Sequence, residues 1–131
     1  MGITNISAKV ANPSDLRNND QVDFMVDSGA IYSVVDKRIL EKLNIKPTTE
    51  REFFLANGEK IKRKMGGATF LYQENEGHSP VIFGEKGDSN LLGAVTLEAL
   101  GMALDPIRRK LLDLPMVLGN LTKSKPLVKL I

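Results

Sequence analysis

The chain has 131 residues, the length of one domain, and its 42% hydrophobic and 26% charged residues are typical of globular proteins. It has no cysteine and a single histidine, which excludes disulfides, thiol nucleophiles and metal sites built on cysteine or several histidines. A net charge of +2 and 5% aromatic residues do not indicate nucleic-acid binding. Apolar runs are too short for a membrane helix, and the first fifteen residues lack a signal-peptide core, so we expect a cytoplasmic protein.

The first part of the chain predicts a β-hairpin followed by a short helix. Apolar and polar residues alternate over residues 6–10 and again over 22–27, which is typical of half-buried strands. The segment between them, 11–20, is rich in turn-forming residues. Residues 36–43 then change to helical spacing, with Asp36 in the position of an N-cap.

The middle of the chain returns to a β pattern. Short strands are predicted at residues 53–55, 61–65, 68–72 and 81–83. Asn57-Gly58 is the strongest short sequence signal for a tight hairpin turn. The pair Gly66-Gly67 predicts a strand bend or bulge, or a hinge, and residues 74–77 predict a further turn.

The last part predicts one more helix and a final hairpin. Residues 95–100 have helical spacing, and Gly101 is placed to end the helix. Two short strands are expected at 102–104 and 111–114, and residues 115–131 form either a terminal strand or a tail. Many short strands with two short helices predict a mainly β fold, closed or barrel-like.

The most informative local feature is an aspartate at the end of an apolar strand, in the sequence Asp27-Ser28-Gly29-Ala30. Burial of an unpaired carboxylate is costly, so an aspartate at the tip of a core strand needs a reason. Asp, Ser and Gly are also turn formers, and these residues alone are equally compatible with a simple turn in which Asp27 bonds to nearby backbone N–H groups.

A second motif, Leu91-Leu92-Gly93, precedes the helix at 95–100. The order of strand, Asp-Ser-Gly-Ala, helix, Asn-Gly hairpin, Leu-Leu-Gly, helix and final strands resembles the retroviral-type (retropepsin-like) aspartic proteases, over residues 3–114. The chain is similar to small prokaryotic members of that clan. The resemblance implies a retropepsin-like acid-protease fold, a closed β-barrel-like half-lobe with one or two short helices, in residues 1–114. Residues 115–131 would then be a dimerisation strand or a tail.

The resemblance also implies roles for the Asp-Ser-Gly-Ala turn. Asp27 would be the catalytic carboxylate, and the Ser28 hydroxyl would bond across a dimer interface. Gly29 would let the backbone bend close to the catalytic group and leave room for the substrate main chain. Ala30 would complete the active-site turn.

Two further motifs receive roles in the same way. Asn57 and Gly58 would form a flap that closes over a bound peptide and excludes water. Leu92 and Gly93 would pack beneath the active-site turn. A polypeptide substrate would bind in extended form, through main-chain hydrogen bonds.

The number of candidate aspartates implies a homodimer. Aspartic proteases need two carboxylates that share one proton, one to activate a water and one to polarise the scissile carbonyl. This chain has one Asp-Ser-Gly, because the other candidate, Asp88-Ser89-Asn90, lacks the glycine. A two-fold axis would bring Asp27 of both chains together. The implied activity is an aspartic endopeptidase that needs neither metal nor cofactor.

A different class of function remains open for the same fold. A retropepsin-like module can dimerise or bind extended peptides without cleaving them, with Asp27 kept as a turn residue. The basic run 60–64 is interpreted as a solvated edge strand in preference to a phosphate contact. His78 is interpreted as an exposed turn residue in preference to a member of a Ser/His/Asp triad.

Overall fold

The computed structural model describes residues 2–115. Its strands and helices in chain order are β1 (Thr4–Asn12), β2 (Asp15–Val26), β3 (Ser33–Asp36), α1 (Lys37–Lys42), β4 (Thr49–Phe54), β5 (Lys60–Tyr72), β6 (Asn75–Gly84), β7 (Leu91–Leu92), α2 (Ala94–Leu100), β8 (Met102–Asp105) and β9 (Lys110–Asp113). The mainly β fold predicted from the sequence is confirmed. The predicted strand or tail at 115–131 falls almost wholly outside the described residues.

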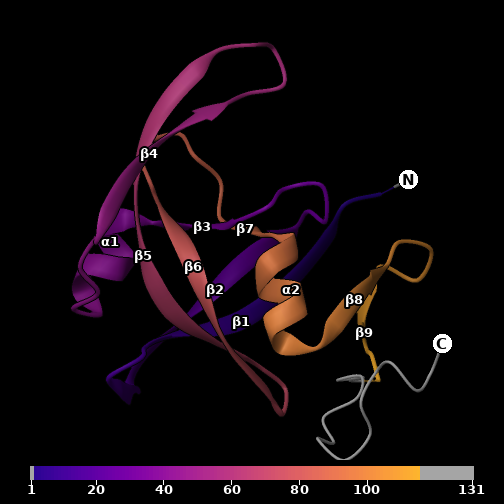
Figure 1. Ribbon diagram of the computed structural model, residues 1–131. Helices are drawn as coiled ribbons and strands as arrows, with labels where there is room; N and C mark the ends of the chain where they lie inside the picture. The colour runs from indigo at the N-terminus through magenta and orange to yellow at the C-terminus, as the bar shows by residue number, and fades with distance from the viewer. Residues whose placement is uncertain (1, 116–131) are drawn as a thin grey trace, which may run out of the picture.

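The main sheet closes on itself. Its strand order is β1-β2-β7-β3-β6-β5-β4, and β1 also pairs with β5, so that six of its strands form a ring with β4 added outside it (Figure 1). The ring encloses an apolar core in which the Phe24 and Phe70 rings lie 5.9 Å apart, centroid to centroid. Helix α2 packs on β6 and adds Leu97 and Leu100 to this core. The predicted closed, barrel-like arrangement is therefore confirmed.

The first hairpin forms as predicted, but its turn is shorter than expected. Strands β1 and β2 are antiparallel, and the register pairs Ile6 with Phe24. The turn-forming residues 18–20 lie within β2 because tertiary contacts hold them there: the Asn18 amide donates to the Leu43 carbonyl at 2.8 Å, at the end of α1. Local turn propensity is overridden by this contact.

Strand β3 was not expected from the sequence. It is four residues long, runs parallel to β6 and makes one further pair with β7. A segment this short shows no clear alternation, so its pairing comes from the neighbouring strands. The helix that follows is the predicted one, and the predicted N-cap is confirmed: the Asp36 carboxylate accepts a hydrogen bond from the Arg38 backbone N–H at 2.9 Å.

This cap predicts a pH-dependent contribution to stability. Hydrogen bonds from the Arg38 side chain and backbone lower the pKa of Asp36 from 3.8 to about 2. Since the folded-state pKa is the lower one, the stabilisation is present above pH 4 and is lost as the pH falls towards 2. We expect Asp36→Ala to lower the free energy of unfolding by about 1 kcal/mol at pH 7. Urea unfolding should show this difference shrinking between pH 4 and pH 2; an equal loss at both ends would contradict the assignment.

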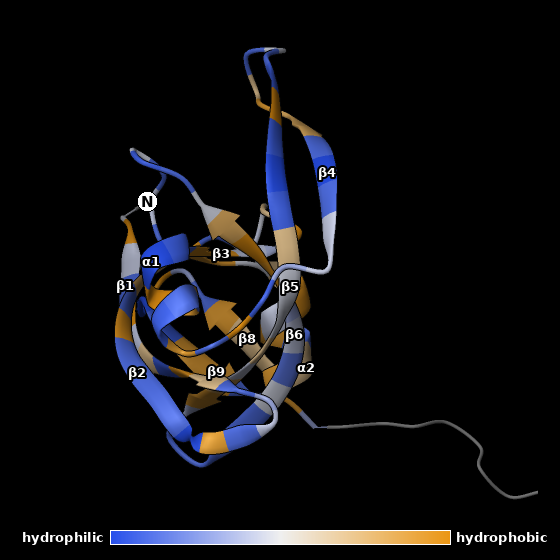
Figure 2. Ribbon diagram, turned by 90° about the vertical axis from the view of Figure 1, so that its left-hand side faces the viewer, coloured by the Kyte–Doolittle hydropathy of each residue, from blue (hydrophilic) through white to orange (hydrophobic). Residues whose placement is uncertain are grey.

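Strands β4 and β5 form a long hairpin that projects from the barrel (Figures 1 and 2). The predicted tight turn at Asn57-Gly58 is confirmed: Gly58 has φ of 89°, and the Leu55 N–H donates to the Glu59 carbonyl at 2.8 Å. Residues 60–64 of β5 pair with β4, and from Met65 onward β5 pairs with β6. The hairpin is thus continuous with the barrel wall.

The predicted interruption of β5 at Gly66-Gly67 is wrong. The β5–β6 register runs without a bulge from Met65 to Tyr72, so the two predicted runs are one strand. The glycine at position 66 has a packing role instead, because a Cβ there would lie 3.0 Å from the Lys46 carbonyl and 3.1 Å from the Phe83 ring. The predicted bulge is therefore absent, and close packing accounts for the glycine at position 66.

Two other local predictions also need correction. The turn expected at 74–77 lies earlier, at residues 73–74, where Gln73 has φ of 55° and Tyr72 pairs with Asn75. His78 is exposed, but it lies within β6 and not in a turn, with its Nδ1 2.6 Å from the Thr69 hydroxyl on β5. A cross-strand hydrogen bond of this kind stabilises the sheet.

The final elements agree with the sequence. Gly101, with φ of 70°, ends α2 in the left-handed conformation, and β8 and β9 form the expected hairpin. Within the described part of the chain, neither helix has the length and apolar character needed to cross a membrane.

Candidate active site

The Asp27 turn begins where β2 ends. The Asp27 backbone N–H donates to the Leu92 carbonyl at 2.9 Å, which ties the turn to the neighbouring strand β7. The Asp27 carboxylate accepts a hydrogen bond from the Gly29 N–H at 3.0 Å, and the Asp27 backbone carbonyl accepts one from the Ala30 N–H at 3.1 Å. Asp27 is half-buried, whereas Ser28 and Gly29 are exposed. The turn therefore presents a fixed carboxylate at an accessible end of the barrel.

The two sequence motifs lie directly against each other. β7 runs parallel to β2, with Leu92 beside Val26, and Leu92 is fully buried. The Ala94 N–H donates to the Ala30 carbonyl at 2.8 Å. A Cβ on Gly93 would lie 2.6 Å from the backbone of Tyr32. Leu92 and Gly93 thus lie beneath the loop that follows Asp27.

A buried network of hydroxyl groups supports this contact. The Ser33 hydroxyl accepts a hydrogen bond from the Gly93 N–H at 2.9 Å and also bonds to the Thr96 hydroxyl on α2. The Thr96 hydroxyl in turn lies 2.8 Å from that of Ser79 on β6. The sequence analysis missed these residues. The sequence signal that could have revealed them is a serine or threonine next to apolar core residues, as in Ser33-Val34-Val35.

The network predicts a measurable loss of stability on removal of its central hydroxyl. Thr96→Val keeps the shape of the side chain but leaves the buried Ser33 and Ser79 hydroxyls without this partner, which costs about 2 kcal/mol. Urea unfolding measures the difference. Thr49→Val, at an exposed position, is the matched control and should have little effect. Equal stabilities of wild type and Thr96→Val would contradict a supporting role for the network.

The predicted flap residues lie at the tip of the β4–β5 hairpin. Asn57 and Gly58 are exposed, and the Asn57 side chain contacts Glu59, donating to its carboxylate at 2.7 Å. Figures 1 and 2 both show the hairpin rising from one end of the barrel, and the colours of Figure 1 place the loop after β2 at that end. The side chain of Asn57 makes its hydrogen bonds with Glu59 of the same hairpin.

Between the hairpin and the Asp27 loop lies a recess of about 580 Å³. Gly29 and Ala30 form its border with the Asp27 turn, and Phe53 and Ile61, a cross-strand pair of the hairpin, form another side. Tyr32 links the two sides, because its ring contacts Phe53 edge-on with centroids 6.3 Å apart. The recess lies beside the candidate carboxylate and has a size typical of ligand pockets.

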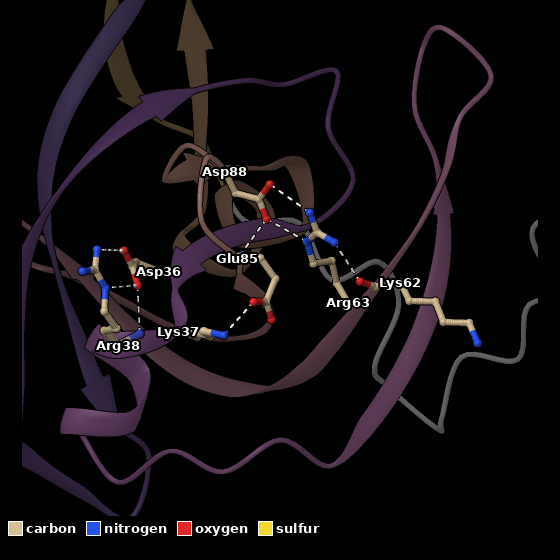
Figure 3. A network of polar contacts seen from close by, with 7 residues as sticks. All are labelled: Asp36, Lys37, Arg38, Lys62, Arg63, Glu85 and Asp88. Carbon is tan, nitrogen blue, oxygen red and sulfur yellow. Dashed lines mark hydrogen bonds and ion pairs between the residues drawn. The ribbon is translucent and has the colours of Figure 1, made fainter.

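A charged pair that the sequence analysis did not predict borders the same recess. Arg63 on β5 and Asp88 in the β6–β7 loop form a bidentate ion pair (Figure 3). Arg63 Nε donates to Asp88 Oδ2 at 2.7 Å, and Arg63 Nη2 donates to Asp88 Oδ1 at 3.0 Å. The hydrogen bond from Arg63 lowers the pKa of Asp88 and raises the pKa of Arg63. The pair joins residues 25 positions apart, so no local pattern could reveal it. Asp88, weighed above as a second candidate aspartate, is engaged in this ion pair.

The comparisons with known proteins agree with this geometry. A family model described as "Aspartyl protease" matches residues 13–94, more than half of the chain. The fold is similar to that of EIAV protease complexed with the inhibitor HBY-793, with a TM-score of 0.59, 15% identity, and coverage of 79% of this chain and 93% of that one. It is also similar to the solution structure of the simian foamy virus (mac) protease, with a TM-score of 0.50, 18% identity, and coverage of 74% and 92%.

No curated protein matches the chain. The matched region spans both Asp27 and Gly93, the two motifs that the fold brings together. The chain therefore belongs to the aspartyl protease family and has the retropepsin-like fold of the retroviral proteases.

Proposed function

We propose that the protein is an aspartic endopeptidase that acts as a homodimer, with Asp27 of each chain forming the catalytic dyad. The observation that carries the proposal is the Asp27 turn, which β7 holds at an accessible end of the barrel and in which Asp27 is half-buried. One such turn per chain supplies half of the required pair of carboxylates. A two-fold axis beside the turn supplies the other half.

The chemistry follows from two carboxylates held close together. Two like charges about 3 Å apart do not both ionise easily, so the dyad holds one proton. The ionised carboxylate takes a proton from a water molecule, which attacks the scissile carbonyl carbon. The protonated carboxyl donates a hydrogen bond to the carbonyl oxygen and stabilises the charge that develops there. The tetrahedral intermediate then collapses: the C–N bond breaks, the leaving nitrogen receives a proton from the dyad, and the products are a carboxylic acid and an amine. No covalent bond to the enzyme forms.

The other predicted residues complete the proposal. The Ser28 hydroxyl, exposed beside Asp27, bonds across the dimer interface, and the exposed Gly29 leaves room for the main chain of an extended peptide. Asn57 and Gly58 close over the bound peptide as the tip of the flap. Residues 1–114 form the protease domain, and residues 115–131 add a dimerisation strand or a tail. The protein acts in the cytoplasm.

The test is cleavage of a mixed peptide library between pH 4 and 7, with and without pepstatin, beside the Asp27→Asn variant. We expect cleavage that pepstatin inhibits and that declines towards neutral pH, because the dyad must hold a proton. Activity that rises steadily to pH 9 would contradict the mechanism. No cleavage at concentrations where light scattering shows a dimer would favour the alternative, a peptide-binding or dimerisation module with the same fold.

A further inference from the structure

We propose that the Arg63–Asp88 ion pair keeps the recess beside Asp27 selective for an uncharged, apolar substrate side chain, because each partner neutralises the charge of the other. Loss of either partner alone redirects selection to a side chain of opposite charge to the partner that remains. The inference rests on the proposed function, since it concerns the substrate of that same site. It names the class of side chain that the recess accepts and the two residues that set this class.

The floor of the recess is apolar. Val34 on β3 pairs with Leu91 on β7 and with Ile82 on β6, and Leu91 also pairs with Met25 on β2. Residues paired across neighbouring strands share one face of a sheet, so these four side chains form a continuous row. All four line the recess. An apolar substrate side chain therefore gains contact along the whole floor.

The ion pair forms a polar wall above this floor. Arg63 follows Ile61 by two positions on β5, which places both side chains on the same face of the hairpin, and both line the recess. Asp88 reaches the recess from the β6–β7 loop (Figure 3). Their side chains are 17% and 26% exposed, so the pair is partly shielded from water.

The charges of this wall are already satisfied by the protein. The third nitrogen of the Arg63 guanidinium donates to the Lys62 carbonyl at 2.8 Å, and the Asp88 carboxylate also accepts from the Glu85 N–H at 2.8 Å. A charged substrate side chain entering the recess would lose water without gaining a free partner, which is unfavourable. An apolar side chain has no such cost.

The wall is also held in position from the other side of the loop. Glu85 accepts a hydrogen bond from the Lys37 ammonium at 2.6 Å, and the Asn90 side chain accepts from the Asp36 N–H at 2.8 Å. The β6–β7 loop is thus anchored to the start of α1 as well as to the hairpin (Figure 3). When Arg63 is removed, Asp88 therefore stays at the recess with its charge unpaired. When Asp88 is removed, Arg63 stays on its strand, where it keeps its hydrogen bond to the Lys62 carbonyl.

The test measures peptide binding and does not depend on catalysis. Proteins carrying Asp27→Asn are titrated, by fluorescence anisotropy, with peptides that differ only in Leu, Glu or Lys at one position, each position being scanned in turn. We expect the parent protein to prefer Leu at one position. There, Asp88→Asn should raise the Glu-to-Leu affinity ratio about tenfold, and Arg63→Gln should raise the Lys-to-Leu ratio about tenfold, the effect of one charge-assisted hydrogen bond.

Two controls separate specificity from a structural role. The double variant Arg63→Gln/Asp88→Asn lacks the ion pair and both charges, and it should keep the preference for Leu. Glu76→Gln removes the same charge as Asp88→Asn from the adjoining strand β6, but Glu76 is exposed and does not line the recess, so its ratios should match those of the parent. If the single variants weaken all peptides equally, or if no peptide binds, the inference is wrong.

The outcome for the proposed function is read separately, from cleavage by the protein with Asp27 intact. If the protein cleaves peptides but the affinity ratios do not change as expected, the proposed role of the Arg63–Asp88 pair in side-chain selection is wrong, and the protease proposal is retained. The expected changes without any cleavage support the recess and its wall, and overturn the protease proposal.

Discussion

Replacing Asp27 by Asn is expected to lower peptide cleavage by about 10³-fold, within the range for loss of a general acid–base group. Asparagine has the same shape and keeps an oxygen that can accept the Gly29 N–H, so the turn should persist. It cannot take a proton from water, and in the homodimer both members of the dyad are changed. Steady-state cleavage of a library-derived peptide measures the loss, and circular dichroism checks the fold.

A matched control and a mixing experiment sharpen this result. Asp23→Asn removes an exposed carboxylate from the same strand and should leave cleavage unchanged. When equal amounts of wild type and Asp27→Asn are mixed and allowed to exchange chains, about one quarter of the dimers carry two wild-type chains. Activity per total protein should therefore fall to about one quarter of the wild-type value. A fall to only one half, in proportion to the wild-type chains, would mean that each chain acts alone.

Gly93→Ala is expected to have the largest effect on stability at the site. A Cβ at position 93 would lie 2.6 Å from the Tyr32 carbonyl group and 3.0 Å from the Ala30 oxygen, and these are backbone atoms that cannot rotate away. We expect a loss of about 3 kcal/mol in the free energy of unfolding, the upper part of the range for overpacking. The loop after Asp27 must move, so cleavage should be lost as well.

Gly67→Ala is the matched control for this variant. Position 67 also lies in the sheet, but a Cβ there meets no atom within 4 Å, so the free energy of unfolding should change little. Urea unfolding of both variants gives the comparison. A Gly93→Ala protein as stable as Gly67→Ala would show that the close packing of Gly93 on the loop is not required.

The parts of the fold that were predictable have local causes. The Asn57-Gly58 turn follows from the ease with which glycine adopts positive φ, and the start of α1 follows from the hydrogen bond that the Asp36 carboxylate accepts from the backbone N–H two residues later. The Asp27 motif was found because an unpaired aspartate is costly to bury at the end of an apolar strand, whereas the Leu92-Gly93 motif was found from the resemblance to the retropepsin-like proteases. The turn, the helix start and the aspartate are signals that are complete within a few residues.

The parts that were missed depend on residues distant in sequence. Strand β3 exists because β6 and β7 lie on either side of it, and the hydroxyl network joins Ser33 to Thr96 across 63 positions. The Arg63–Asp88 pair is equally non-local. Gly66 was noticed, but its reason was misjudged, because the sequence does not show that the Lys46 carbonyl and the Phe83 ring approach it.

The unbroken course of β5 has a consequence for how the site and the barrel influence each other. One strand of 13 residues serves first as half of the projecting hairpin and then as a wall of the ring, where it pairs with both β6 and β1. Under the proposed function, a peptide that draws the hairpin towards the Asp27 turn would also strain the hydrogen bonds that β5 makes within the ring. By reciprocity, occupancy of the site and the rigidity of the barrel would then be thermodynamically linked.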